Sequence, residues 1–326
     1  MKTKVFITAL CVCLCIVAQA QNHKNEAPKG KAIIQVFGNF HTGFGAENND
    51  RGFELDRSYF GYQYAVTPNL EIKAVMDVGK SSHVDDLQRV AYIKNAQVKW
   101  TKGNLTLNGG LISTTSFKIQ EDFWGYRYMK MVLQDYYKFA SSADLGLSVA
   151  YKFAEWISMD AIIVNGEGYK KIQKNDGLQY GLGATFFPVE GVTMRIYGSI
   201  NERSDKSLEN SNLYAAFIGY KHEKFSIGAE YNRIENMSNI DNHNLSGVSI
   251  YSTIKLCDKV NSFLRHDNIW SKDDWNVNKD EATYMAGIEY SPCRYVKIAP
   301  NFRYHHAKSA ITRNRSMAYI NCYFGF

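Results

Sequence analysis

The chain has 326 residues, with 38 basic and 32 acidic side chains and a formal net charge of +6. This excess is mild and dispersed, so it does not favour a nucleic-acid partner. Three of the six cysteines lie near the start of the chain, and the others, Cys257, Cys293 and Cys322, are widely spaced. This spacing predicts no disulfide framework, no metal site and no cofactor. The 22 tyrosines and 18 phenylalanines against only 5 prolines favour strands over helices or disorder.

The chain begins with the features of a secretory signal peptide. Two lysines precede an apolar run over residues 5–17, and Ala18-Gln19-Ala20 forms a small-x-small cleavage site. We expect residues 1–20 to be removed on export and residues 21–31 to form a short N-terminal segment in the periplasm. The alternative is an uncleaved anchor, but the run is shorter than the ~20 apolar residues of a membrane-spanning helix.

Between residues 32 and 326, apolar and polar residues alternate repeatedly with the period of a β-strand. In the stretch "LEIKAVMDVG", aliphatic side chains occupy every second position, and Glu71, Lys73 and Asp77 lie between them. Segments of about 10 residues match a tilted strand that crosses a bilayer. In chain order, alternating segments cover residues 34–41, 57–66, 70–79, 95–100, 105–111, 144–153, 178–186, 192–201, 225–232, 248–256, 282–290, 296–304 and 318–326.

The connections between these segments alternate in length. Tight turns such as Thr67-Pro68-Asn69 are followed by longer polar stretches such as residues 79–90. Seven short turns and eight long loops would join sixteen strands and leave both termini on the periplasmic side, as in outer-membrane barrels. Residues 213–220 and 260–269 alternate poorly, so counts of 14 and 18 strands stay open.

Aromatic residues gather near the expected short turns, for example Trp100, Phe153 and Trp156. Such rings prefer the interface between membrane and water. The alternative is that they cap a soluble β-sandwich. The last residues argue against this alternative, because apolar side chains alternate up to a terminal phenylalanine, Phe326, as in the final strands of bacterial outer-membrane barrels.

These observations predict an all-β protein, a transmembrane antiparallel up-and-down β-barrel of about 16 strands. A bilayer leaves strands no other option than a closed cylinder, and sixteen strands enclose a water-filled lumen. The alternation places both basic and acidic side chains on the inner wall, with a slight excess of bases that makes weak anion preference a hypothesis. The inward-facing bases are Arg57, Lys73, Lys99, Lys152, Arg195, Lys255, Lys297 and Arg303, and the acids are Glu71, Asp77, Asp144, Asp160, Glu230 and Glu289.

The third long loop, residues 113–142, is the longest and is rich in aromatic residues. Long loops in compact proteins are usually functional or disordered, and aromatic content argues against disorder. We expect this loop to fold into the barrel, narrow the pore and present Lys118, Arg127, Lys130 and Lys138 to passing solutes, which would favour anions. The alternative is an external lid held together by its own aromatic side chains.

The stretches "DRSYFGYQYAVTPNLEIKAVMDVG" and "SSADLGLSVAYKFAEWISMDAIIVNGEGYKKIQKNDGLQYGLGATFFPVEGVTMRIYGS" resemble the phosphate-selective porin O and P family. The resemblance covers most of the mature chain and includes "NGEG" at residues 165–168. It implies a sixteen-stranded barrel, often a homotrimer, with a constricting third loop. The dense run of arginines and lysines described for the phosphate-selective members is not evident here, so a general porin for small hydrophilic solutes fits the mixed wall better.

We therefore expect an outer-membrane porin that lets small hydrophilic solutes or ions diffuse passively. Its partners would be outer-membrane lipid and lipopolysaccharide. The alternatives are a barrel enzyme of the phospholipase or protease type, or a surface-binding structural barrel. An enzyme needs a nucleophile beside a base, and the strand-borne histidines His41 and His266 show no recognisable partner spacing. We therefore predict no catalytic residues.

Overall fold

The computed structural model describes residues 29–45, 48, 50–80, 89–173 and 176–326. The expected signal peptide and residues 21–28 lie outside the described residues. Within the described part of the chain, no helix is both long enough and apolar enough to span a bilayer.

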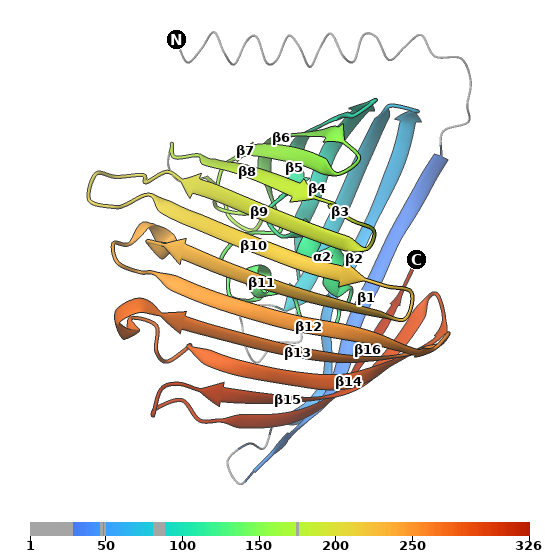
Figure 1. Ribbon diagram of the computed structural model, residues 1–326, viewed down its shortest axis with the longest axis vertical. Helices are drawn as coiled ribbons and strands as arrows, with labels where there is room; N and C mark the ends of the chain where they lie inside the picture. Colours follow the sequence, from blue (N-terminus) through green and yellow to red (C-terminus); the bar gives the residue numbers. More distant parts are fainter. Residues whose placement is uncertain (1–28, 46–47, 49, 81–88, 174–175) are drawn as a thin grey trace.

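Sixteen antiparallel strands close into a barrel, in which each strand pairs with its neighbours along the chain and β1 pairs with β16 (Figure 1). Backbone hydrogen bonds between Ile34 and Phe326 continue the seam beyond the last strand. The strands are β1 Lys29–Phe44, β2 Arg51–Thr67, β3 Leu70–Lys80, β4 Arg89–Lys102, β5 Leu105–Ser113, β6 Ala143–Ala154, β7 Ile157–Val164, β8 Gln179–Phe186, β9 Val192–Asn201, β10 Ser211–Lys221, β11 Phe225–Glu235, β12 Leu245–Cys257, β13 Val260–Ser271, β14 Glu281–Cys293, β15 Val296–Ala307 and β16 Arg315–Gly325. The predicted sixteen-stranded barrel is confirmed.

In the part of the chain that the structure describes, the helices are few and short. Two α-helices, α2 Lys118–Trp124 and α3 Leu133–Tyr136, lie in the connection between β5 and β6. Two 3₁₀ turns, η2 Met237–Asn239 and η3 Lys272–Asp274, lie in the connections that follow β11 and β13.

The alternation seen in the sequence separates the two faces of the wall. In β6, Leu145, Leu147 and Phe153 are at least half exposed on the outside of the barrel, whereas Asp144 and Ser148 are buried on the inside. Every backbone group of a closed sheet can pair within the wall, so the outer face can be apolar throughout. The same pattern continues around the barrel, which has an apolar outer surface.

The two weakly alternating segments become β10 and β13, and their inner faces explain the weak pattern. Leu213, Phe217, Phe263 and Ile269 point inward and are buried, although the inner face of a pore is usually polar. They pack against residues 114–142, which lie inside the barrel. Both faces of β10 are therefore largely apolar, whereas the inner face of β13 mixes Phe263 and Ile269 with the charged Arg265 and Asp267, and the count of sixteen holds.

The two ends of the barrel differ. Tight turns connect the strands at one end, and longer connections join them at the other (Figure 1). The start of β1 and the end of β16 both lie at the short-turn end. Near that end, Phe153, Trp156 and Phe225 are exposed, as expected for rings at a boundary between apolar and aqueous surroundings.

Candidate pore constriction

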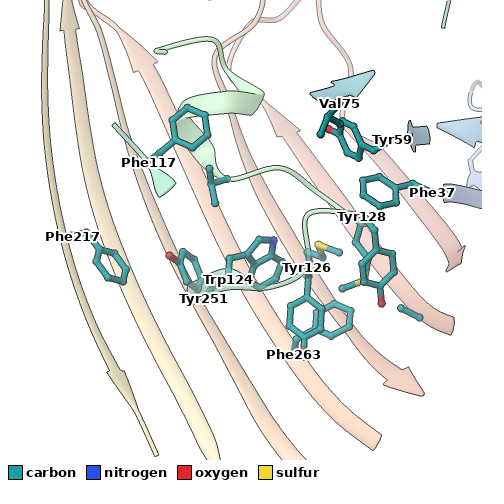
Figure 2. Packing of buried hydrophobic residues seen from close by; sticks show 14 residues of the cluster. Phe37, Tyr59, Val75, Phe117, Trp124, Tyr126, Tyr128, Phe217, Tyr251 and Phe263 are labelled. Atoms are coloured by element: carbon teal, nitrogen blue, oxygen red, sulfur yellow. The ribbon is translucent and has the colours of Figure 1, made fainter. Parts of the chain in front are cut away.

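The connection between β5 and β6 folds into the barrel. Its apolar side chains form two clusters with inward-facing residues of the strands, and Figure 2 shows the one that contains Trp124. Trp124, at the end of α2, is 1% exposed, and its ring centroid lies 5.3 Å from that of Tyr251 and 5.0 Å from that of Tyr126. The segment therefore has its own apolar core against the inner wall and is not an external lid.

Hydrogen bonds hold the middle of this segment at a fixed depth. The Tyr128 hydroxyl donates to Glu289 on β14 at 2.8 Å, and the Arg303 guanidinium on β15 donates to the Met129 carbonyl at 3.1 Å. Within the segment, the Trp124 indole N–H donates to a backbone carbonyl at 2.8 Å. Hydrogen bonds to charged groups are stronger than neutral ones, so these contacts restrain the segment in addition to its apolar packing.

A buried ion cluster lies beneath the segment. The Asp267 carboxylate is 2.8 Å from the Lys130 ammonium and 2.8 Å from the Arg265 guanidinium, and it accepts a hydrogen bond from Ser249 at 2.6 Å. Lys130 is only 4% exposed. Its burial lowers the pKa of this loop lysine, and the attraction of Asp267 opposes that shift. Lys130 therefore anchors the segment to β13 and is not presented to the lumen.

Arg127 lies on the other side of the same segment. It forms ion pairs with Glu121 and with Asp135, the latter at 2.5 Å. Its guanidinium also donates to the hydroxyl of Tyr59 on β2, with nitrogen to oxygen distances of 3.3 and 3.4 Å. Arg127 therefore connects the segment to β2, a second part of the inner wall.

Three cations converge on the Tyr59 hydroxyl oxygen. Besides Arg127, both Arg57 and Lys94 donate to it at 3.3 Å. Lys94 reaches the lumen through a β-bulge, because β3 pairs Val75 with Asn95 but Met76 with Ile93. A bulge turns two consecutive side chains towards one face. Arg57 is paired with Asp77 at 3.2 Å, whereas Lys94 has no carboxylate partner among the described residues.

The wall formed by β3 and β4 carries further lysines without ion pairs. Among the residues that the structure describes, neither Lys73 nor Lys99 lies within 4.0 Å of a carboxylate. Glu71, next to Lys73, instead accepts a hydrogen bond from Gln63 at 2.6 Å. Lys73 experiences the charges of three lysines, Lys94, Lys118 and Lys99, against the single opposite charge of Glu71. This side of the lumen is therefore a positively charged surface that faces the inserted segment.

Comparison with known proteins identifies the architecture. No protein-family model matches the chain, and no curated protein matches it by sequence. The structure is similar to that of OmpF from Salmonella typhi in complex with daunomycin, with a TM-score of 0.68 and 10% identity over 93% of this chain and 99% of that chain. It is also similar to the outer membrane channel DcaP of Acinetobacter baumannii (TM-score 0.65, 10% identity, 93% and 99% covered). A mutant of the Rh. blastica porin gives a TM-score of 0.60 at 12% identity, with 91% and 100% covered.

The fold is that of bacterial outer-membrane porins. At these identities the similarity is one of fold. The fold points to the bacterial outer membrane as the location of the protein, with lipid against the apolar outer surface of the barrel.

Within this porin fold, three of the sequence-predicted bases are exposed. Lys118 is paired with Asp122 one helical turn further along α2, and its side chain is 52% exposed. Lys138 is exposed in the inserted segment and has a positive φ of 61°. Lys152 is paired with Glu155 at the short-turn end, at 2.5 Å. The structure therefore brings Lys118 to the β3–β4 surface but leaves Lys152 near a rim.

Two other predicted bases are locked within the inner wall. Arg195 is 3% exposed and binds Asp160 with two nitrogen to oxygen distances of 2.7 and 3.0 Å. Arg303 is 9% exposed, and it donates to Asn301 at 2.9 Å and to Asn321 at 2.8 Å, in addition to its bond with the inserted segment. Arg195 thus has a carboxylate partner, whereas amide and carbonyl oxygens hold Arg303, and both arginines position the wall and the segment.

The residues that sequence reasoning missed have identifiable causes. Lys94 breaks the strict alternation because it belongs to a bulge, which the pattern does not reveal. Arg265 and Asp267 fall in the weakly alternating segment of β13. Tyr169 and Lys170 follow the "NGEG" stretch in a loop, where alternation says nothing about direction. Only the adjacent aromatic and basic residues could have drawn attention to this loop.

Proposed function

We propose that this protein is an outer-membrane porin through which small hydrophilic solutes diffuse passively, with a preference for anions. The observation that carries the proposal is a group of three lysines on the inner wall that faces the inserted segment. These lysines, Lys73, Lys94 and Lys99, have no carboxylate partner among the described residues. Unpaired charges in a narrow, poorly screened passage act strongly on a passing ion. Paired charges elsewhere on the wall contribute much less.

The resemblance to the phosphate-selective porin O and P family supports phosphate as one of the anions to test. The same resemblance implies a homotrimer, which light scattering of the detergent-solubilised protein would test. A barrel enzyme has less support. His41 contacts Asn39 and Asp50, at 2.8 and 3.2 Å, and the ring of His266 stacks on Tyr284. Neither histidine has a hydroxyl or thiol nucleophile as its hydrogen-bond partner among the described residues.

The test is the reversal potential of the purified protein in planar bilayers under a KCl gradient. We expect a chloride to potassium permeability ratio above one. The triple variant Lys73→Gln, Lys94→Gln, Lys99→Gln should lower the ratio to about one or below, because it removes the unpaired charges. Lys152→Gln is the matched control, since it removes a paired lysine near a rim, and it should leave the ratio unchanged.

Cation preference in the wild-type channel would reject the anion preference. An unchanged ratio in the triple variant would reject the lysines as its cause. Absence of ion conductance from correctly folded protein would reject the channel function itself.

A further inference from the structure

Five side chains form a ladder in which tyrosines and lysines alternate inside the barrel. The Lys170 ammonium lies 5.0 Å from the ring centroid of Tyr92 and 5.6 Å from that of Tyr169. The Lys94 ammonium lies 5.9 Å from the ring centroid of Tyr169 and 4.6 Å from that of Tyr59. We call Tyr92, Lys170, Tyr169, Lys94 and Tyr59 the tyrosine–lysine ladder.

The ladder is held by contacts between four parts of the chain. Tyr169, in the connection between β7 and β8, donates a hydrogen bond to Asp77 on β3, and its backbone N–H donates to the Ala143 carbonyl at 3.0 Å. Its ring lies edge-on to that of Tyr92 on β4, with 6.5 Å between centroids. Asp77 is in turn paired with Arg57 on β2. The rings are therefore fixed in place by bonds and are not merely adjacent.

The ladder runs across three neighbouring strands of the inner wall. In the strand register, Tyr59 on β2 and Tyr92 on β4 both lie opposite Asp77 on β3. Lys170 is exposed in the connection between β7 and β8, at the long-loop end of the barrel. At Tyr59 the ladder meets Arg127 of the inserted segment. The ladder therefore forms a strip of the inner wall beside the inserted segment, where a solute that enters from the long-loop end would meet it.

The ladder offers binding groups for two features of one solute, a carboxylate and an apolar ring. Neither Lys94 nor Lys170 has a carboxylate partner among the described residues. Each lies over aromatic rings in cation–π geometry, and Lys94 also donates a hydrogen bond to the Tyr59 hydroxyl. A carboxylate can approach such an ammonium without displacing an acidic side chain. The three rings offer apolar surface and edges to the remainder of the solute. Inorganic anions could use the lysines but not the rings.

We propose that the tyrosine–lysine ladder is a saturable binding site for carboxylate solutes that carry an aromatic ring. This inference rests on the proposed function, because it assigns a solute class to the same anion-preferring passage. The carboxylate pairs with Lys94 or Lys170, and the ring packs against Tyr92 and Tyr169.

The experiment compares block of KCl current by benzoate, cyclohexanecarboxylate, acetate and phosphate in planar bilayers. We expect saturable block by benzoate at a half-blocking concentration about five-fold below that of acetate, the size of one aromatic contact. Cyclohexanecarboxylate should fall between them. Tyr92→Leu should raise the half-blocking concentration of benzoate by about five-fold without changing that of acetate. Lys94→Gln should weaken block by both carboxylates, and Lys152→Gln by neither.

Calorimetric titration of the detergent-solubilised protein with benzoate provides a second readout that needs no current. Heat-modifiable mobility of each variant on a gel shows that the barrel has folded. Anion preference together with equal block by benzoate and acetate would overturn the ladder and leave the proposed function intact. Saturable benzoate binding without anion preference would support the ladder and overturn the anion half of the proposed function. A channel that shows neither would overturn both.

Discussion

Two walls of the barrel carry basic side chains in different surroundings. On β13 and β15, Arg265 and Arg303 are buried beneath the inserted segment. Arg265 pairs with Asp267, and Arg303 donates to amide and carbonyl oxygens. On β3 and β4, Lys73, Lys94 and Lys99 have no carboxylate partner among the described residues. The covered wall, β13 and β15, uses its charges to hold the inserted segment, whereas the open wall, β3 and β4, carries lysines without ion pairs. Under the proposed function, whether a base serves structure or transport thus depends on what covers it.

Removing Trp124, the ring of the inserted segment that packs against the covered wall, should have the largest effect. Trp124→Ala should lower the free energy of unfolding by about 3–5 kcal/mol, because it leaves a cavity where the ring packs between the inserted segment and the wall. Denaturant unfolding in micelles measures this loss, and single-channel conductance should rise as the segment loosens. Trp156→Ala is the control, since Trp156 is 56% exposed at a short turn. Equal losses in the two variants would contradict the assigned role of Trp124.

Breaking the buried ion cluster should have the second largest effect. Asp267→Asn should lower the free energy of unfolding by about 3 kcal/mol, because Lys130 and Arg265 would remain buried without their counter-charge. Denaturant unfolding in micelles measures this loss as well. Glu155→Gln removes the exposed pair with Lys152 and should cost about 0–1 kcal/mol. A loss as small in Asp267→Asn as in Glu155→Gln would show that the covered wall does not depend on this cluster.

The ion selectivity that the open wall provides should depend on salt concentration. The stability that the covered wall provides should not. The screening length falls from about 10 Å at 0.1 M to about 3 Å at 1 M salt. The chloride to potassium permeability ratio should therefore decline towards one as the mean KCl concentration rises. The unfolding midpoint should change only by the general effect of salt on protein stability. A ratio independent of salt would point to a steric origin of selectivity.

The smallest effects should come from the exposed pair on α2. Lys118→Gln should slightly lower the anion preference, and Asp122→Asn should slightly raise it, because each removes one charge at the rim of the open wall. Each variant should change the free energy of unfolding by only about 0.3–0.5 kcal/mol, as for other exposed helix pairs. If both variants shifted the chloride to potassium permeability ratio in the same direction, this pair would lie outside the solute path.

Most of the fold followed from local pattern. Alternation, short turns and long connections predicted the sixteen-stranded barrel, because each strand must show one face to an apolar medium and the other to the lumen. The same rule predicted that Asp77, Asp160 and Glu230 face inward. It was weakest at β10 and β13, where apolar side chains on the inner face pack against the inserted segment.

The barrel, the strand faces and the aromatic character of the third long connection were thus predictable from local pattern, since these depend on neighbours along the chain. The pattern did not reveal that Lys130 is buried against Asp267, that a bulge turns Lys94 inward, or that three cations meet at Tyr59. These features arise from contacts between residues far apart in the chain. A period of two tells which face a side chain takes, but not what lies opposite that face.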